Sequence, residues 1–484
     1  MVFLQYVYNK DYKILKLNAK RFDKAVLLTN DRGNFCVLSN QDYDKLIFKN
    51  LDEKLFKKLE DNFMILTDSN FSEYSDRFNK FNWSLGKAAD LHIIVPTLRC
   101  NFTCKYCFAK RECEDNTSTD MAEETMDKTI DFIFSVPSRS CYLEFTGGEP
   151  LIRFDLVRRA VLKSKNLAKT MNKKVSFSIV SNGTLLNDEI IDFLIENDVN
   201  LCISIDGNKE IHDSNRKFTR NLSSSSYDSI ISSIKKLKAK DFDNLAYIPV
   251  ILKDSLKYYK EIVDEYINLG ARTLRFKYVS RFGFASDAWK SMSYSAEEFL
   301  DSWKKTINYM LLKNDEGIKI KEDFAVIILR KLLSGKNERY TELMNPCGAV
   351  YSQLSYNYDG NIFTCDEART VDEFNIGNVF TSKYSDLAEH PVSKSLQSSS
   401  NLTAYNCDSG CPWFSFCGIC PLEIYLERNS GFITNINSNY RHKLHLGMFE
   451  FIMEKLLDED IREKLISWVY PEKIPESVLD KLKF

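Results

Sequence analysis

Alternation between strand-like and helix-like segments from residue 91 onward is the feature that most restricts the fold of this chain. Six apolar runs, among them LHIIVPT, VSFSIVS and NLCISID, are separated by helical patterns such as DLVRRAVLKSKNLAK and YDSIISSIKKLK. Continuous apolar strands linked by helices predict a parallel sheet covered by helices. Six such units predict a partial or complete β/α barrel, in which chemistry gathers at the carboxyl ends of the strands.

Composition and charge exclude several classes of protein. The 484 residues are 44% hydrophobic and 28% charged, with a formal net charge of −2, so no broad basic face indicates a nucleic-acid partner. We find no apolar stretch of about 18 residues, and MVFLQYVYNKDYKILK lacks the form of a cleavable signal. We therefore expect a cytoplasmic protein with no membrane partner. In that reducing compartment, its 13 cysteines indicate metal ligands or redox centres rather than disulfides.

Three cysteines, Cys100, Cys104 and Cys107, follow the first strand-like run in the stretch TLRCNFTCKYCFAK. A structural zinc ion needs four ligands in a closed geometry, and a disulfide framework needs an even number of cysteines. Three thiolates can instead bind three irons of a [4Fe–4S] cube, so that the fourth iron is open to a small molecule. Unrelated buried cysteines or a zinc site are the alternatives.

Short motifs follow the next three strands in order: FTGGEP, then SNG, then SIDGNKEIHDSNR. The residues singled out in them are Gly147, Gly148 and Glu149, then Ser181 and Asn182, then Ser204 and Arg216. Glycines permit a close backbone approach, and a guanidinium can form two parallel hydrogen bonds with a carboxylate. Each motif alone is a weak signal, but their order at successive strand ends predicts one site.

The sequence pattern Cys-x-x-x-Cys-x-Tyr-Cys, together with these motifs, resembles that of the radical SAM superfamily. The resemblance implies a [4Fe–4S] cluster held by the three cysteines and by S-adenosylmethionine. It assigns the GGEP residues to the methionyl amino group, Ser181 and Asn182 to the ribose, and Ser204 and Arg216 to the nucleoside and the carboxylate. Tyr106 of the cysteine motif belongs to the same cofactor-binding set. The implied chemistry is that of the cofactor, whose 5′-deoxyadenosyl radical takes a hydrogen atom from the substrate.

Six further cysteines lie near the C-terminus: Cys347, Cys365, Cys407, Cys411, Cys417 and Cys420. Their arrangement resembles the SPASM extension, which carries auxiliary [4Fe–4S] clusters in peptide-modifying radical SAM enzymes. The resemblance implies an inner cluster at Cys347, Cys365 and Cys420, and an outer cluster at the other three. A zinc site is the alternative, because paired cysteines at short spacing also bind zinc.

The chain departs from the SPASM pattern in two ways. The last four cysteines are spaced by three, five and two residues instead of two, five and three, and no cysteine follows Cys420. Asn439 stands where the family has its last cysteine. We therefore expect His442, His445, Asp408 or solvent to complete the outer cluster, unless that cluster is smaller or absent. The inner cluster also lacks one thiolate, which leaves a position open to substrate or to another ligand.

Asp366 directly follows Cys365. An aspartate at this place in the related sulfatase-maturing enzymes acts as a base that removes a substrate proton, so the resemblance implies the same role here. A turn or capping role is the alternative. Of the cysteines outside both constellations, Cys141 and Cys202 lie in apolar strands, which predicts small core residues.

Four stretches, VLLTNDRGNFCVLS, SRFGFAS, YNYDGNIFTCDEAR and FNIGNVF, resemble the maturases of the His-Xaa-Ser peptide system and related cyclophane-forming enzymes. The resemblance implies a ribosomally made precursor peptide, a side-chain crosslink with a cyclophane C–C bond, and an electron donor such as flavodoxin or ferredoxin. The N-terminal segment then captures a leader peptide as an added strand, or is simple scaffolding. Alternatives are a thioether-forming maturase, an anaerobic sulfatase maturase that makes formylglycine, and a non-catalytic iron–sulfur carrier or zinc-stabilised binding protein.

The fold implied is α/β, with a partial (β/α)6 TIM-like radical SAM barrel at residues 86–285. A winged-helix-like α+β domain at residues 1–85 precedes the barrel, and its hairpin is predicted at AVLLTNDRGNFCVLS. A helical connector at residues 286–345 follows the barrel. The cysteine-rich SPASM domain with a C-terminal helix covers residues 346–484.

Overall fold

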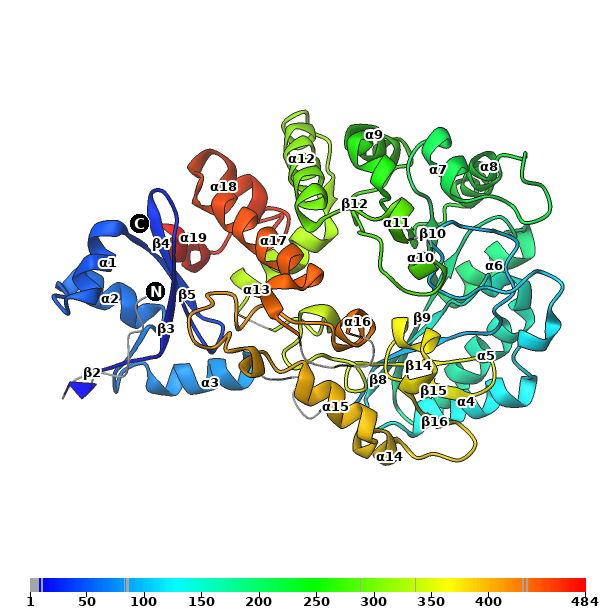
Figure 1. Ribbon diagram of the computed structural model, residues 1–484, viewed down its shortest axis with the longest axis horizontal. Coiled ribbons are helices and arrows are strands. Elements are labelled where there is room, and N and C mark those ends of the chain that lie inside the picture. The colour runs from blue at the N-terminus through cyan, green and yellow to red at the C-terminus, as the bar shows by residue number, and fades with distance from the viewer. Residues whose placement is uncertain are drawn as a thin grey trace. The chain divides into compact units, whose positions relative to one another are not determined.

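The computed structural model describes residues 8–9, 12–81, 83, 87–287, 289–335, 337–428, 431 and 434–484. The chain divides into two compact units, each built from separate stretches of sequence (Figure 1). Unit 1 comprises Met1–Leu85, Asp323–Gly348 and Gln397–Phe484, and unit 2 comprises Gly86–Glu322 and Ala349–Leu396. Residues 1–7 of the predicted N-terminal domain, and its predicted border at residues 85 and 86, lie outside the described residues. The four predicted domain limits stay a prediction.

Unit 2 is built around a parallel sheet whose strands alternate with helices along the chain. Its parallel strands are β7 (Leu91–Ile94), β8 (Ser140–Phe145), β9 (Lys174–Ser181), β10 (Val199–Ser204) and β11 (Leu245–Ile248). The helices between or after them are α4 (Glu123–Ser135), α5 (Phe154–Thr170), α6 (Asp188–Asn197), α7 (Lys209–Asn215), α8 (Ser226–Ala239) and α9 (Tyr259–Asn268). The predicted strand–helix alternation is therefore confirmed.

The two faces of this sheet differ in polarity. Leu143, Phe145, Ile179 and Ile203 are fully buried on one face, where α5 and α6 pack against β9 and β10. The opposite face carries half-buried polar residues, namely Tyr142, Glu144, Asn200, Cys202 and Ser204. The prediction of continuously apolar strands is wrong for β8 and β10, because side chains alternate between a dry face and an open one.

This alternation separates the two strand cysteines. Cys141 lies on the helix-covered face with 1% of its surface exposed, so the prediction of a core residue is confirmed. Cys202 lies on the polar face and is half-buried, so the same prediction is wrong for it. Its neighbours across the strands, Val180 and Ala246, share that face.

The sheet does not close into a barrel within the described residues. β12 (Thr273–Leu274) pairs in parallel with β13 (Lys321–Glu322) instead of extending the main sheet. The other edge of the sheet is extended by β14 (Gln353–Tyr356), which runs parallel to β7, and by antiparallel β15 (Asn361–Phe363) and β16 (Asn375–Asn378). The expected partial barrel is confirmed, and residues 349–396 form part of its unit.

Unit 1 contains the predicted hairpin within an antiparallel sheet of β3 (Leu17–Arg21), β4 (Ala25–Asn30) and β5 (Phe35–Ser39). The Asn30 side chain fixes the turn, since its Oδ1 accepts hydrogen bonds from the N–H groups of Arg32 and Asn34 at 2.9 and 3.2 Å. A second small sheet contains β1 (Tyr8–Asn9), β2 (Tyr12–Ile14) and β6 (Ile65–Leu66). The helices of this part of the chain are α1 (Asn40–Ile47), α2 (Glu53–Asp61) and α3 (Phe71–Phe81).

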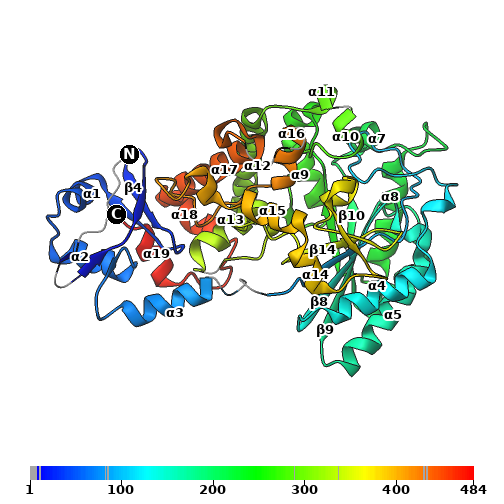
Figure 2. The same cartoon turned by 60° about the horizontal axis from the view of Figure 1, so that its bottom comes forward.

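The C-terminal part of unit 1 is helical and returns to the N-terminal sheet. Its main helices are α13 (Asp323–Leu333), α16 (Pro421–Glu427), α17 (Tyr440–Leu457), α18 (Glu459–Ile466) and α19 (Glu476–Leu482). α13 packs on α17, and α19 packs on β5, so the C-terminal helix lies against the N-terminal sheet (Figure 1, Figure 2).

The remaining helices are short, except for one in the predicted connector. They are α10 (Phe284–Asp287), α11 (Trp289–Met292), α12 (Ala296–Asp315), α14 (Tyr384–Glu389) and α15 (Pro391–Ser399). α12 begins with a capping box formed by Ser295 and Glu298. Among the helices that the structure describes, none has both the length and the hydropathy that a membrane span requires.

Candidate functional site

The loop that follows β7 carries Cys100, Cys104 and Cys107 and is tied to the segment after α7. The Thr103 N–H donates to the Lys217 carbonyl at 2.7 Å, and the Lys105 N–H donates to the Asn215 carbonyl at 3.2 Å. The rings of Phe102 and Phe218 pack edge to face with centroids 4.9 Å apart. The first and fourth sequence motifs therefore form one layer at the carboxyl end of the sheet.

The glycines of FTGGEP let this cysteine loop lie directly against the end of β8. The Gly148 N–H donates to the Thr97 carbonyl at 3.0 Å, and the Glu149 N–H donates to the Arg99 carbonyl at 2.7 Å. A Cβ atom at Gly148 would lie 2.1 Å from the Arg99 carbonyl oxygen, and Gly147 has a φ of +130°. The close approach expected at these glycines is thus made by the chain's own loop. Their contact with a methionyl amino group stays a prediction.

Glu149 joins the second motif to the third. Its Oε1 accepts hydrogen bonds from the Ser181 hydroxyl at 2.8 Å and the Leu151 N–H at 3.1 Å, and its Oε2 accepts one from the Asn182 N–H at 2.8 Å. The side chain is 1% exposed, and burial raises the pKa of this carboxyl to about 7 against the effect of these donors. Glu149 therefore holds the ends of β8 and β9 together.

Asn101 completes the connection between the cysteine loop and the third motif. Its Oδ1 accepts a hydrogen bond from the Asn182 side-chain amide at 2.7 Å, and its own amide donates to the Thr184 hydroxyl at 2.9 Å. Asn101 was not predicted from the sequence, although its place directly after Cys100 is a signal that a loop-fixing residue follows the first expected ligand.

Asp206 is the buried centre of the site, and the sequence analysis missed it as well. Its carboxylate is fully buried and accepts hydrogen bonds from the Tyr106 hydroxyl, the Asn215 amide at 3.3 Å and the Val250 N–H at 3.1 Å. It also forms an ion pair with Arg216, whose Nε and a terminal nitrogen both lie 3.1 Å from Oδ1. The available signal was the acid in SIDG, two residues past Ser204 at the end of β10.

Arg216 is placed by this carboxylate. Its guanidinium is 5.1 Å from the centroid of the Tyr106 ring, and the residue is 7% exposed. Burial opposes its charge, but Asp206 more than compensates, so the pKa of Arg216 is raised. The structure brings Arg216 and Tyr106 together, and the carboxylate between them is that of Asp206. Contacts of Ser204 and Arg216 with S-adenosylmethionine stay a prediction.

The three thiols of the cysteine loop lie close enough to affect one another electrostatically. Burial raises the pKa of Cys104 to about 12, although Arg216 lowers it, and burial also raises the pKa of Cys100. Charge on Cys104, Glu149 or Cys107 raises the pKa of Cys100 further. Bound iron would compensate the grouped thiolates, and three thiolates are a suitable donor set for a [4Fe–4S] cluster.

The described residues contain no group of three or more His, Cys, Asp or Glu side chains arranged around a single metal ion. Each thiolate of a cubane cluster binds a different iron, so cluster ligands are spaced differently from the ligands of one ion. The donor set at Cys100, Cys104 and Cys107 therefore fits a cluster by its chemistry, and the ligand assignment stays a prediction.

The outer set of C-terminal cysteines lies in unit 1. The Cys411 N–H donates to the Cys407 carbonyl at 3.1 Å, and the Cys417 N–H donates to the Trp413 carbonyl at 2.9 Å. Burial raises the pKa of Cys407 and of Cys417 to about 12, and charge on Cys411 raises both further. These three thiols are therefore neighbours, as a shared cluster requires.

The inner set is divided between the units. Cys347 and Cys420 belong to unit 1, and Cys365 belongs to unit 2. The Cys347 N–H donates to the Ser400 hydroxyl at 2.9 Å, and Cys420 is the residue before α16. The assignment of these three cysteines to one cluster stays a prediction.

Asn439, which stands in the place of the family's last cysteine, has another contact in the structure. So do His445 and Asp408, two of the groups proposed to complete the outer cluster. Asn439 is 1% exposed and caps α17 by accepting a hydrogen bond from the His442 N–H at 2.9 Å. The buried His445 ring lies with Nδ1 3.2 Å from the Gly418 carbonyl oxygen and stacks on Phe324. Asp408 forms an ion pair with Lys16 at 3.0 Å. Binding of a cluster by His442, His445 or Asp408 stays a prediction.

Asp366 lies at the end of β15 and accepts a hydrogen bond from the Arg369 Nε at 2.9 Å. Its side chain makes no capping hydrogen bond to the short helix that follows, so the contact seen is an ion pair and not a cap. Arg369 in turn lies over the Phe108 ring, 5.2 Å from its centroid, next to Cys107. Asp366 is therefore connected to the cysteine loop, and its role as a base stays a prediction.

Glu144 is a second acidic residue that the sequence motifs did not predict. It lies on the polar face of β8, and its Oε2 accepts a hydrogen bond from the Ser178 hydroxyl at 3.2 Å. Burial raises the pKa of Glu144 to about 7, and the charge of Asp366 adds to this, whereas Ser178 and Lys277 oppose it. The polar face of the sheet thus carries an acid whose pKa is raised in part by Asp366. A lone charged residue within the strand CYLEF was the available signal.

Residues 94–266 match the sequence model of the Radical SAM superfamily. The matched segment contains the cysteine loop, the GGEP and SNG motifs, Asp206 and Arg216, which are the residues that the structure groups at the carboxyl end of the sheet. The chain therefore contains a radical SAM domain and is a radical SAM enzyme. Members of this superfamily use a [4Fe–4S] cluster and S-adenosylmethionine, and the donor set described above suits them.

Curated relatives extend beyond this domain. The chain is 26% identical over 344 residues to a cysteine-type anaerobic sulfatase-maturating enzyme of Clostridium novyi, which covers 68% of this chain and 87% of the relative. It is 24% identical over 373 residues to the radical SAM cyclopropyl synthase TigE of Paramaledivibacter caminithermalis, which covers 74% of this chain and 72% of the relative.

Solved structures show the same fold. The structure of anSMEcpe with bound AdoMet and the Cp18Cys peptide matches 79% of this chain and 99% of its own, with a TM-score of 0.63 and 19% identity. Streptococcus suis SuiB bound to the precursor peptide SuiA matches 89% of this chain and 99% of its own, with a TM-score of 0.54 and 14% identity. At these identities the likeness concerns the fold alone.

Proposed function

We propose that this radical SAM enzyme modifies a ribosomally made precursor peptide by joining two of its side chains, in a cyclophane C–C crosslink. The observation that carries the proposal is the polar, half-buried face of the sheet, where Asp366 is close enough to Glu144 to raise the pKa of Glu144. Such a face suits an extended peptide with polar backbone groups better than an apolar small molecule. Relatives of the same fold, anSMEcpe and SuiB, have been solved with peptides.

The cofactors of the proposed reaction are held by the cysteines. Cys100, Cys104 and Cys107 would hold a [4Fe–4S] cluster, and Gly147, Gly148, Glu149, Ser181, Asn182, Ser204, Arg216 and Tyr106 would form the surroundings of S-adenosylmethionine. When bound, the cluster and S-adenosylmethionine supply a radical that takes hydrogen from carbon. The six C-terminal cysteines would hold one or two auxiliary [4Fe–4S] clusters, whose chemistry is electron transfer. An electron donor such as flavodoxin or ferredoxin completes the system.

In this scheme the chain's own residues position and shield the cofactors. Asp206 fixes Tyr106 and Arg216, and Glu149 fixes the loop ends of β8 and β9, so the cofactor site is rigid before substrate arrives. Formation of a bond to an aromatic ring releases a proton from that ring. Asp366, oriented by Arg369, is the group we propose to accept this proton.

Capture of the leader peptide is proposed for unit 1. β3 pairs only with β4 on one side, so its other edge is free for an added strand among the described residues. The opposite edge of the sheet, β5, packs against α19. A leader that adds a strand to β3 would bind through backbone hydrogen bonds.

The test is anaerobic co-expression with the product of a small open reading frame beside the gene, followed by intact mass measurement. Loss of two hydrogens, absent with Cys100→Ala, would support a crosslinking maturase, and fragmentation would identify the joined residues. An unchanged mass for every neighbouring small peptide would contradict the proposal.

Two alternatives have distinct products. The similarity to the sulfatase-maturating enzyme of Clostridium novyi favours formylglycine formation as the second candidate. That reaction converts a single cysteine or serine, so fragmentation would show one altered residue and no link. A thioether would also remove two hydrogens, but its formation would require a cysteine in the peptide and would stop when that cysteine is changed to alanine.

A further inference from the structure

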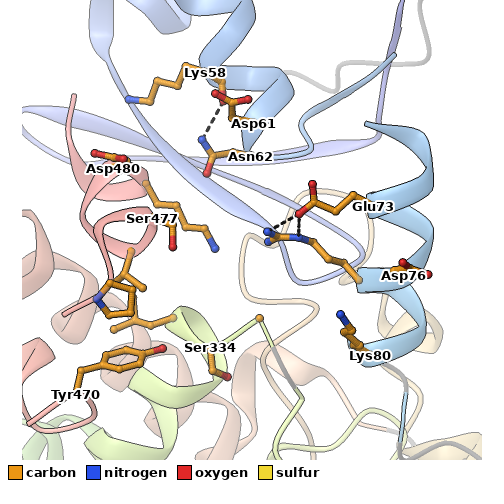
Figure 3. A pocket seen from close by; sticks show the side chains of 16 residues that line it. Lys58, Asp61, Asn62, Glu73, Asp76, Lys80, Ser334, Tyr470, Ser477 and Asp480 are labelled. Atoms are coloured by element: carbon orange, nitrogen blue, oxygen red, sulfur yellow. Dashed lines mark hydrogen bonds and ion pairs between the residues drawn. The ribbon is translucent and has the colours of Figure 1, made fainter. Parts of the chain in front are cut away.

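Unit 1 contains a pocket that neither the radical SAM site nor the cysteines occupy. It lies between α2, α3, the end of α13 and the C-terminal segment from Tyr470 to Lys481, and has a volume of about 760 Å³. In Figure 3 the labelled side chains of these elements surround the pocket from several sides. The volume is within the range of about 300 to 1,000 Å³ that is typical of ligand sites.

Charge is unevenly distributed in this pocket. Lys58, Arg77 and Lys481 are half-buried in its walls. The four acidic residues of the lining, Asp61, Glu73, Asp76 and Asp480, are all exposed to solvent. The interior is therefore cationic, whereas the rim carries these four acids and one exposed lysine, Lys80.

Most of the rim acids already have basic partners, and those partners are mainly outside the pocket. Asp61 pairs with Lys57 at 2.8 Å, and Asp480 pairs with Lys483 at 2.8 Å. Glu73 pairs with Arg77 along α3, where two guanidinium nitrogens lie 3.0 and 2.9 Å from Oε1. Among the described residues, the interior lysines Lys58 and Lys481 form no ion pair with a carboxylate of this rim.

Lys481 is the most constrained of the interior cations. Its Nζ lies 5.5 Å from the centroid of the Phe35 ring, and no carboxylate in the described part of the chain forms an ion pair with it. Burial lowers the pKa of Lys481 to about 8, and the nearby positive charge of Arg77 lowers it further. Burial also lowers the pKa of Lys58, whose Nζ donates to the carbonyl of Lys483. An anion between Lys481 and Arg77 would relieve both the lost hydration of Lys481 and its repulsion by Arg77.

We propose that this pocket binds a carboxylate side chain of the precursor peptide, held by Lys481 and Arg77. The inference rests on the proposed function and adds the chemical class of the leader segment, which is a peptide with an isolated acidic residue. Tyr470, Val478 and Leu333 supply apolar wall for the residues that flank the acid. The exposed rim acids repel a polyanion such as a nucleic acid, but they tolerate a single carboxylate.

The test measures binding of a fluorescein-labelled synthetic peptide to the full-length protein by fluorescence anisotropy, without S-adenosylmethionine. The peptide is the N-terminal half of the product of the small open reading frame beside the gene. A second set of peptides has each Asp or Glu replaced in turn by Asn or Gln. The protein variants are Lys481→Met and Arg77→Met. The matched control is Lys54→Met, which removes an exposed lysine of α2 outside the pocket.

We expect Lys481→Met to weaken binding roughly tenfold, because a hydrogen bond between two charged groups is lost. Replacement of one particular acid in the peptide by its amide should weaken binding to the wild-type protein by a similar factor. The same replacement should have little effect on Lys481→Met, which shows that the two groups contact each other. Lys54→Met should bind as the wild type does, and all variants should keep the wild-type thermal unfolding midpoint within a few degrees.

Equal affinity of the wild type and Lys481→Met would overturn the assignment of the pocket, and so would binding that is insensitive to every acid in the peptide. Absence of peptide binding would overturn it too. Displacement of the peptide by inorganic phosphate, with no effect of the amide replacements, would replace the peptide with a free anion as the ligand. These outcomes are independent of turnover. Acid-dependent binding without any mass change in co-expression would therefore count against the proposed reaction and not against the pocket.

Discussion

The Tyr106 hydroxyl donates to the Asp206 carboxylate, at 2.8 Å from Oδ1 and 2.6 Å from Oδ2. The two residues are 100 positions apart in the sequence, one in the cysteine loop and one after β10. Because the same carboxylate pairs with Arg216, it fixes the cysteine loop, the end of a strand and the start of the next connection at a single point. A cluster-binding loop without regular secondary structure is thereby held by one buried acid.

The first prediction follows from this arrangement. Asp206→Ala should lower the free energy of unfolding by about 3 to 5 kcal/mol, because it leaves the buried Arg216 charge without its partner. The surface variant Asp127→Ala, which breaks an exposed pair with Arg159, should cost less than about 1 kcal/mol. Urea unfolding of anaerobic protein measures both. Equal effects of the two variants would show that Asp206 is not a structural centre.

The second prediction concerns Gly148. Gly148→Ala places a methyl group against the carbonyl oxygens of Leu98 and Arg99, and overpacking of this kind costs about 1 to 3 kcal/mol. It should also reduce the iron content, because the cysteine loop must move. Gly317→Ala is the control, since that position has a φ of +84° but no atom within 4 Å of the added carbon. Unfolding by urea and an iron assay on both variants check this, and unchanged iron in Gly148→Ala would count against the close packing.

The third prediction concerns iron itself. Cys100→Ala should lose about four irons per chain relative to the wild type, if the first cysteine triad binds a cubane cluster. Cys141→Ala removes a buried thiol from the helix-covered face of β8 and should keep its iron. Iron and acid-labile sulfide are measured on anaerobically reconstituted protein. Retention of all iron by Cys100→Ala would contradict the ligand assignment.

The fourth prediction is a dependence of stability on pH that originates at Glu144. Its folded-state pKa of about 7 is above the ordinary value of 4.5, so the folded protein binds the proton more strongly than the unfolded chain does. The resulting stabilisation is complete below about pH 4.5 and is lost as the pH rises through 7. Glu144→Gln should remove this dependence, which amounts to roughly 3 kcal/mol between pH 5 and pH 8.

The measurement for Glu144 is urea unfolding at several pH values for the wild type and Glu144→Gln. The charged groups that influence Glu144 are Asp366 and Lys277, and both are unchanged in the variant. Parallel curves for the two proteins across this pH range would show that Glu144 titrates normally.

Local features of the fold were accessible from the sequence because they depend on nearby residues. The strand–helix alternation, the hairpin at Ala25–Ser39 and the order of motifs at strand ends all follow from periodicity and turn chemistry. The four predicted motifs meet at the end of the sheet because parallel strands share their carboxyl ends. Grouping of Cys100, Glu149, Asn182 and Arg216 was therefore predictable in outline.

Other features depend on contacts that no local pattern contains. The pairing of Arg216 with Asp206 was not predicted, because an acid in a turn has no visible partner until the fold brings one to it. The polar face of β8 and β10 was overlooked because the apolar alternate residues dominate a short strand. The attachment of β14 to β7 was also missed, since backbone hydrogen bonding between strands carries no side-chain signature.

That last pairing affects how the protein is made. Strand β7 leaves the ribosome about 260 residues before its neighbour β14, so one edge of the central sheet has no partner during most of translation. At about 5 to 20 residues per second, this interval lasts roughly 10 to 50 s. An unpaired edge strand is a template for association with other nascent chains. Synthesis of this enzyme therefore passes through a period in which one edge of its sheet is open to association, and a chain that ends before residue 353 would keep that exposed edge permanently.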